Sequence, residues 1–138
     1  MALIPLSVSS HESRDTIKPK ITQMMALNTE ASSAFELALQ DAILKGDMNL
    51  MHSFILPTVD FVIKAKGEVN TVKVSDKDAL NGLQFVLAHL PACTLTISSA
   101  QDGGNIIYIL EFDKKDGKAP LVWALYTKYG QIFKIYVG

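Results

Sequence analysis

The sequence predicts an α+β domain in which helices cover one face of an antiparallel sheet, and three observations support this class. The last third of the chain, residues 92–138, has the pattern of four consecutive strands joined by tight turns. Two earlier stretches place apolar residues at helical spacing. Between those stretches lies a β-rich pair of segments around Gly67. A chain of 138 residues is long enough to bury a core as a single domain.

The first clear helix is expected over residues 29–45. Its apolar positions recur at spacings of three and four: Ala31, Phe35, Ala38, Leu39, Ala42 and Ile43. Gly46 ends this helix, because glycine adopts the left-handed closing conformation at the least cost. Asp47 can then cap a short second helix, and Pro57 fixes its end.

Residues 1–28 form a separate part of the prediction. Thr16 could cap a helix over 15–27, in which Pro19 fits only the first turn. The residues before Thr16 are mixed and turn-prone, and they are expected to be ordered only where they pack on something. We therefore expect an N-terminal arm or extra helix over 1–28 and a single α+β domain over 29–138.

A hairpin and a second long helix are expected in the middle of the chain. A β-rich segment over 58–66 and an alternating segment over 69–74 predict two strands that pair across Gly67. Ser75 and Asp78 have the spacing of a capping box, which opens a helix. The apolar stripe of that helix contains Ala79, Leu80, Leu83, Val86, Leu87 and Leu90.

The final meander is expected to have large apolar side chains on both faces. Its strands are predicted over 94–98, 106–112, 121–126 and 132–137. One face carries Tyr108, Leu110, Trp123 and Leu125, and the other carries Ile107, Ile109, Val122 and Tyr126. Helices can cover only one of these faces. The other face is therefore expected to meet a second molecule or the N-terminal arm.

The composition excludes several classes of protein. The sequence is 49% hydrophobic and 20% charged, and this apolar surplus fits a dimer interface or an apolar cavity. The formal net charge of -1 gives no electrostatic footprint for nucleic acid. Cys93 is the only cysteine, so no internal disulfide can form. No apolar run reaches the roughly 18 to 20 residues that span a membrane, and no signal-peptide pattern is evident, so a cytoplasmic protein is expected.

The order of helix, short helix, two strands, helix and four strands resembles the nuclear-transport-factor-2-like superfamily. Gly46-Asp47 resembles the end of that superfamily's first helix, Asp78-Ala-Leu80 resembles the start of its third helix, and Tyr129-Gly-Gln-Ile132 resembles the turn into its last strand. The resemblance covers residues 29–137. It implies a curved, mixed but mainly antiparallel sheet wrapped around a long N-terminal helix. It also implies an apolar cavity at one end and a homodimer formed through the convex face of the sheet.

The superfamily includes ketosteroid isomerase, scytalone dehydratase and polyketide cyclases, and the isomerase site can be compared residue by residue. Alignment on Gly46-Asp47 places Ile63 near the position of the isomerase base and Leu39 near that of its tyrosine. Both residues are apolar and cannot move a proton or stabilise an oxyanion. The isomerase active site therefore does not carry over, although a shift in register could bring Asp60 closer to the base position.

Asp60 and His52 are the two candidates for catalysis by proton transfer. Asp60 lies in an apolar strand and could act as a general base if it pointed inward. The alternative is an aspartate that faces solvent near the start of the strand. His52 lies on the short helix, near the cavity mouth that the resemblance implies, and could act as an acid or a base. The alternative is a surface histidine at a helix end.

No metal or cofactor is expected, because the histidines His11, His52 and His89 have no ligand-spaced partners. The cavity that the resemblance implies is instead expected to be an apolar ligand pocket. Its proposed lining is Phe35, Leu39, Tyr108, Leu110 and Trp123. The opposite choice of sheet face would move Tyr108 and Trp123 together to the dimer interface.

Two functions from different classes remain open. The first is a homodimeric small-molecule-binding or assembly module with an apolar pocket and no evident catalysis. The second is a small isomerase, dehydratase or cyclase that transfers a proton on an apolar substrate. Convergence of Asp60, His52 or Glu111 in one cavity would favour the enzyme. A cavity lined only by apolar side chains would favour the binding module.

Overall fold

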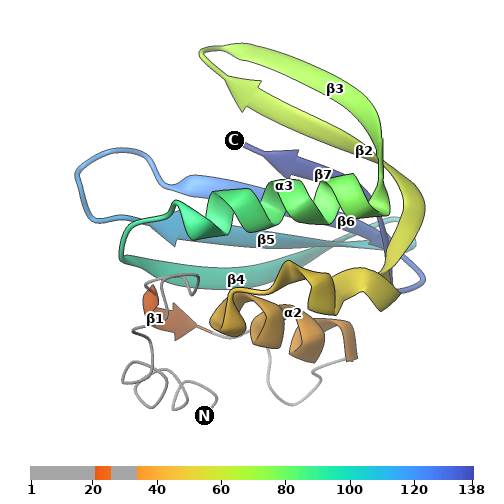
Figure 1. Ribbon diagram of the computed structural model, residues 1–138, viewed down its shortest axis with the longest axis horizontal. Coiled ribbons are helices and arrows are strands. Elements are labelled where there is room, and N and C mark those ends of the chain that lie inside the picture. Colours follow the sequence, from red (N-terminus) through yellow and green to blue (C-terminus); the bar gives the residue numbers. More distant parts are fainter. Residues whose placement is uncertain (1–20, 26–33) are drawn as a thin grey trace.

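The computed structural model describes residues 21–25 and 34–138. Two α-helices, α2 (Ala34–Lys45) and α3 (Asp76–Ala88), and the 3-10 helix η3 (Met48–Phe54) lie over one face of a single sheet (Figure 1). The strands are β1 (Ile21–Met25), β2 (Ile55–Ala65), β3 (Glu68–Ser75), β4 (Cys93–Asp102), β5 (Asn105–Asp113), β6 (Leu121–Lys128) and β7 (Gln131–Val137).

The order of strands across the sheet is β1-β4-β5-β6-β7-β2-β3. The pairs β1–β4 and β2–β7 are parallel, and the other neighbouring pairs are antiparallel. The predicted class is confirmed: an α+β fold with a curved, mixed but mainly antiparallel sheet and the expected order α-α-β-β-α-β-β-β-β. One further strand, β1, precedes that order.

The stretch Ile21–Met25 is a strand, so the helix expected over 15–27 is wrong at these positions; the rest of that range lies outside the described residues. β1 pairs in parallel with β4, with Met24 opposite Leu95. The edge of β4 offers unpaired backbone groups, and a short extended segment can satisfy them by hydrogen bonding. This long-range pairing outweighs a weak local preference for helix.

The end of α2 and the start of η3 are fixed by short-range hydrogen bonds, as predicted. Gly46 has a φ of +67°. Its N–H donates to the Ile43 carbonyl at 3.1 Å, and the Asp47 N–H donates to the Ala42 carbonyl at 2.8 Å. This pair of bonds is the Schellman closure of a helix. The Asp47 carboxylate then accepts from the Asn49 N–H at 3.1 Å and caps η3.

Gln84 on α3 joins this turn to the second helix. Its Oε1 accepts from the Met48 N–H at 2.7 Å, and its Nε2 donates to the Gly46 carbonyl at 2.5 Å. Both backbone groups belong to the helix ends that α2 and η3 leave without internal partners. One side chain therefore holds the two helical segments at a fixed distance from α3.

The predicted cap of α3 is confirmed, because the Ser75 hydroxyl accepts from the Asp78 N–H at 3.1 Å. The side of α3 that packs on the sheet carries Ala79, Leu80, Leu83 and Leu87, all buried. No helix among the described residues has both the length and the apolar character to cross a membrane.

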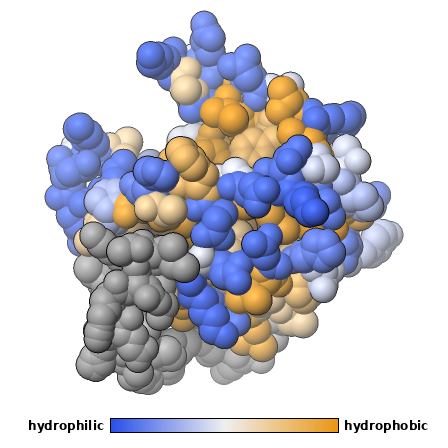
Figure 2. Space-filling model, viewed as in Figure 1, coloured by the Kyte–Doolittle hydropathy of each residue, from blue (hydrophilic) through white to orange (hydrophobic). Residues whose placement is uncertain are grey.

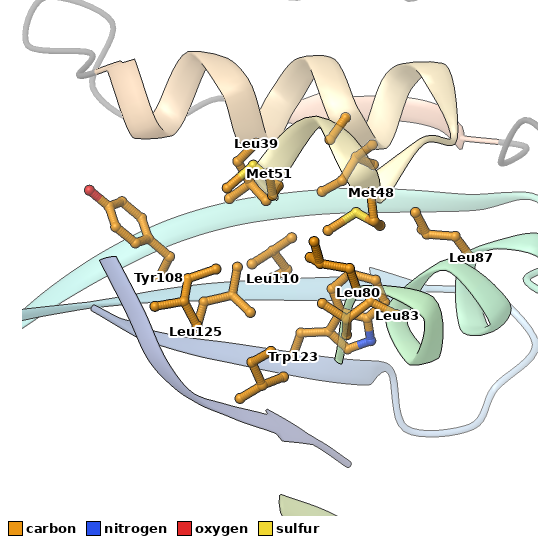
Figure 3. Close-up of a cluster of buried hydrophobic side chains, with 14 of the residues drawn as sticks. Leu39, Met48, Met51, Leu80, Leu83, Leu87, Tyr108, Leu110, Trp123 and Leu125 are labelled. Atoms are coloured by element: carbon orange, nitrogen blue, oxygen red, sulfur yellow. The ribbon is translucent and has the colours of Figure 1, made fainter. Parts of the chain in front are cut away.

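The core lies between the helices and one face of the sheet, here called the inner face. The meander contributes Cys93, Leu95, Ile97, Tyr108, Leu110, Phe112, Trp123 and Leu125 to it, all buried. Figure 3 shows Leu39 and Met51 above this layer and Leu80 and Leu83 beside Trp123. Strict alternation along β4, β5 and β6 places these side chains on one side, as the sequence pattern predicted.

Candidate functional site

The five residues expected to line a pocket all lie in the inner layer. Phe35 and Leu39 come from α2, Tyr108 and Leu110 from β5, and Trp123 from β6. Each of the five is buried, with at most 4% of its surface exposed. The face that carries Tyr108 and Trp123 is thus the one beneath the helices.

The structure brings these residues together in two contacting pairs. The rings of Phe35 and Tyr108 are stacked, with centroids 4.6 Å apart and planes 20° apart. Leu110 and Trp123 are direct partners across β5 and β6. Leu39 is completely buried in the same cluster (Figure 3). The five positions therefore form one continuous apolar layer.

Trp123 carries the polar atom of greatest interest in this layer. The residue has no exposed surface, and its Nε1 has no hydrogen-bond partner among the described residues. Its ring meets the ring of Phe112 in an edge contact, with centroids 5.0 Å apart. A buried indole N–H ordinarily finds an acceptor. The donor is thus available to a molecule that could reach it.

The structure does not bring Asp60 to this layer. Asp60 lies on β2 between Val59 and Phe61, whose buried side chains face inward, so its carboxylate lies on the opposite face. There its Oδ1 accepts from the Lys73 Nζ at 2.8 Å. The side chain is 38% exposed. Its surroundings are those of a surface ion pair.

His52 and Glu111 also lie apart from the inner layer. The His52 side chain is 71% exposed on η3, and its Nε2 lies 3.7 Å from the Asp76 Oδ2. Glu111 is exposed on β5 and lies opposite Thr96 of β4 and Val122 of β6. Asp60, His52 and Glu111 thus occupy three different places, and none is beside Trp123.

Neither a metal site nor a reactive thiol emerges from the described part of the chain. The residues 21–25 and 34–138 hold no group of three or more histidine, cysteine, aspartate or glutamate side chains arranged to bind a metal ion. Burial is the largest influence on Cys93 and raises the pKa of its thiol, which Lys114 lowers and Asp113 raises to a smaller extent. A buried, protonated thiol is a poor nucleophile at neutral pH.

The opposite face of the sheet, here called the outer face, is also largely apolar. Its members are Val62, Ile107, Ile109, Val122, Ala124, Tyr126, Phe133 and Tyr136, all buried or partly buried. One row across the strands runs Ile109, Ala124, Tyr136 and Val62. Lys134 borders this apolar area, with its Nζ 4.9 Å from the centre of the Tyr126 ring.

Sequence reasoning missed two features of these faces. Phe133 is the extra residue of a β-bulge, because Tyr126 pairs with Lys134 while Thr127 pairs with Ile132. Alternation alone cannot reveal such an insertion. The second feature is the pairing of Asp60 with Lys73, which the sequence could have predicted. The two-residue turn Lys66-Gly67, with φ of +54° and +81°, fixes the register of the hairpin and places these two residues opposite each other.

Solved structures resemble the chain over most of its length. A designed NTF2 protein with a long sheet has a TM-score of 0.55 and 14% identity, over 75% of this chain and 96% of that one. A DUF4783 family protein from Bacteroides uniformis has a TM-score of 0.54 and 9% identity, over 73% and 93%. A protein from Shewanella frigidimarina, provisionally named a ketosteroid isomerase, has a TM-score of 0.50 and 14% identity, over 83% and 100%.

At the level of sequence, no protein-family model and no curated protein matches the chain. Identities of this size carry the fold and do not transfer an activity. The order of the helices and strands, the order of the sheet and the structural neighbours agree with one another. The chain has the fold of the nuclear-transport-factor-2-like proteins.

Proposed function

We propose that this chain is a non-catalytic binding module that holds a small apolar ligand between its helices and the inner face of its sheet. The observation that carries the proposal is the buried Trp123 N–H without an acceptor among the described residues, set in an apolar layer. Small-molecule sites combine an apolar and aromatic lining with a few polar groups that fix orientation. Trp123 would supply the polar group, and Phe35, Leu39, Tyr108 and Leu110 the lining.

The chemistry of the layer narrows the ligand to an uncharged molecule with a hydrogen-bond acceptor. Thr127 is the only buried polar residue among those described, and its hydroxyl already donates to the Ile106 carbonyl at 2.9 Å. The buried residues that share the core cluster with Trp123 carry no charge, so a charged ligand there would have no charged partner, which is strongly unfavourable. A carbonyl or ether oxygen beside Trp123 would instead satisfy a donor whose burial alone costs about 1–3 kcal/mol.

Native mass spectrometry of the purified protein, followed by titration with apolar ketones, tests this proposal. Trp123 is the only tryptophan, so its fluorescence reports directly on the layer. A saturable change in emission together with a rise in Tm is expected. An exposed-site control, Phe85→Ala, should bind as the unaltered protein does, because Phe85 is 65% exposed on α3. The absence of any saturable response across the ketone series would refute ligand binding.

The proposal includes a homodimer formed through the outer face. Supporting it are the apolar rows of that face, with Ile109, Ala124 and Tyr136 side by side and only partial burial of the large side chains. Interface cores are typically apolar and rich in aromatic residues. Sedimentation velocity should give a dimer at micromolar concentration, and Ile109→Lys should weaken it while Ser99→Lys, at an exposed site on β4, should not. A cytoplasmic setting is part of this proposal.

Proton-transfer chemistry is the alternative, and its support comes only from the fold and from the provisional name of one structural neighbour. Against it stand the ion pair of Asp60 and the exposure of His52. Exchange of ketone α-protons with deuterium, followed by NMR, separates the two functions. We expect no exchange above the buffer rate. Exchange that disappears in Asp60→Asn or His52→Gln would establish the enzyme instead.

A further inference from the structure

β3 is an edge strand with an unusually open outer side. It is the last strand of the sheet, at the end opposite β1, and in Figure 1 it forms the top border of the molecule. Every one of its residues except Val74 is exposed. No described strand pairs with its outer side, so alternate backbone N–H and C=O groups along Glu68–Ser75 are free to pair with another strand.

Proline and bulges, two features that protect an edge strand from pairing, are absent from β3, and its one lysine, Lys73, is already paired with Asp60. The stretch Glu68–Ser75 contains neither proline nor glycine. Its pairing with β2 runs without a bulge from Ala65 opposite Glu68 to Thr58 opposite Ser75. The apolar side chains of Val69 and Val72 are 58% and 51% exposed. A regular, unkinked strand of this length is a template for a further strand.

The two ends of β3 carry opposite charge. Lys64 and Lys66 lie at the hairpin turn that precedes the strand, together with Glu68. Asp76 and Asp78, with Lys77 between them, form the first turn of α3 directly after the strand, and the charge of Lys73 near this end is balanced by its ion pair with Asp60. An antiparallel copy of the same strand would place the basic end of one molecule against the acidic end of the other. This complementarity favours a second copy of this chain as the partner.

We propose that β3 pairs antiparallel with β3 of a second copy, around a two-fold axis that passes through Thr71. In this register Thr71 lies opposite the partner's Thr71, Val69 lies opposite the partner's Lys73, and Lys66 reaches the partner's Asp76. Cross-strand pairs of threonines and of opposite charges are favourable in antiparallel sheets. Two neighbouring registers are less favourable. With Val72 on the axis, Glu68 would lie opposite the partner's Asp76, which has the same charge. With Asn70 on the axis, Lys66 would lose its contact with the carboxylate of the partner's Asp76.

The pairing also extends an apolar surface. The Phe61 ring packs against Gly82 of α3, because a Cβ added to this glycine would lie 3.5 Å from the ring. The face of the β2–β3 hairpin that carries Phe61 is therefore directed toward α3. Ile63 and Val72 lie on the same face and are 43% and 51% exposed. Figure 2 shows hydrophobic residues gathered between the hairpin and α3. A two-fold axis perpendicular to the sheet places this face of both copies on the same side of the joined sheet. Val72 and the partner's Val72 then become diagonal neighbours across the new strand pair.

This edge interface is separate from the outer-face dimer proposed above. The edge residues belong to β3, whereas Ile109, Ala124 and Tyr136 belong to β5, β6 and β7. The inference does not rest on a ligand or on the outer-face contact. If both interfaces form, each molecule has two different partners, and the chains assemble beyond a dimer.

Disulfide trapping tests the edge interface and its register. Cys93 is 1% exposed, so Thr71→Cys introduces the one accessible thiol among the described residues. Directly opposite residues of antiparallel strands have Cα atoms about 4.5–5.5 Å apart, within reach of a disulfide. Mild oxidation at micromolar concentration should convert Thr71→Cys to a covalent dimer. Val69→Cys, on the same strand but opposite the partner's Lys73, should remain largely monomeric.

Equal cross-linking of the two cysteine variants, or none in either, would overturn the proposal. A second measurement uses no covalent bond. Thr71→Lys places two like charges opposite each other and should raise the dissociation constant of edge pairing by about tenfold or more. Thr71→Ser is the matched control and should leave it unchanged. Both are made in an Ile109→Lys background to remove the outer-face contact, with circular dichroism confirming the fold; an unchanged constant in Thr71→Lys contradicts edge pairing.

Discussion

Asp60 and Lys73 face each other across β2 and β3, with the lysine Nζ 2.8 Å from the carboxylate Oδ1. The pair stands on the outer face of the sheet, on the other side from Trp123 and the rest of the inner layer. The acid that was the best catalytic candidate by sequence is therefore a partner of a surface lysine. Its position removes the main reason to expect proton transfer inside the fold.

The Asp60–Lys73 pair should contribute little to stability. The two side chains are 38% and 74% exposed, and solvent screens their attraction. A double-mutant cycle with Asp60→Asn and Lys73→Met should give a coupling free energy below about 1 kcal/mol, decreasing with salt. Ketone binding in Asp60→Asn should match the unaltered protein. A coupling above about 2 kcal/mol, or lost binding, would mean that Asp60 has a role beyond this pair.

Gln84 should matter more than its position on a helix surface suggests. Gln84→Ala removes the partners of the Met48 N–H and the Gly46 carbonyl. We expect the free energy of unfolding to fall by about 1–3 kcal/mol, measured by urea denaturation. Gln84→Glu is the matched variant, because it can still accept from Met48 but cannot donate to Gly46. We expect Gln84→Glu to lose less unfolding free energy than Gln84→Ala. Equal losses in the two variants would mean that the hydrogen bond to the Gly46 carbonyl accounts for the whole contribution of Gln84.

The sequence predicted the fold from signals that act within a few residues. Gly46 and Ser75 mark a helix end and a helix start because their backbone conformation and side-chain bond are local. β1 was predicted incorrectly because its structure depends on the free edge of β4, about 70 residues away in the chain. The contacts of Gln84 with Gly46 and Met48 also join segments far apart in the chain and left no local trace.

The candidate site could be predicted only in part, for a related reason. Alternation placed Tyr108 with Leu110 on one face, and it separated Asp60 from Phe61, as the structure shows. Which face the helices cover is decided by the whole packing arrangement and is not encoded in a single strand. The missing acceptor of Trp123 Nε1 likewise depends on every side chain around it, so only the folded chain reveals it.

Cys93 should make the protein less stable as the pH rises through the alkaline range. Burial raises the pKa of this thiol above its ordinary value of 9.0, so the unfolded chain loses the proton at a lower pH than the folded chain does. The stabilisation is complete below the unfolded pKa and is lost as the pH rises toward the folded one. As the pH rises above about 9, the unfolding free energy should fall more steeply than in Cys93→Ala, by at most about 1.4 kcal/mol per pH unit. Parallel curves for the two proteins would show that the thiol ionises equally in both states.

Trp123→Phe should remove the discrimination between two ligands that differ in one oxygen atom. The probe pair is a bicyclic ketone and the hydrocarbon of the same carbon skeleton, each titrated by isothermal calorimetry, since the variant has no tryptophan emission. The unaltered protein should bind the ketone more tightly, because its oxygen can accept from the Trp123 Nε1. One hydrogen bond contributes about 0.5–1.5 kcal/mol, so Trp123→Phe should weaken ketone binding by roughly two- to tenfold more than hydrocarbon binding.

The matched variant for this prediction is Phe112→Leu, which changes the ring beside Trp123 and leaves its N–H in place. It should weaken both ligands by a similar factor, because it alters packing and not hydrogen bonding. Equal weakening of the two ligands in Trp123→Phe would show that the indole N–H does not contact the ketone oxygen. If the unaltered protein bound the hydrocarbon but not the ketone, the apolar site would still be supported, and the Trp123 N–H would have no role in recognising the ligand.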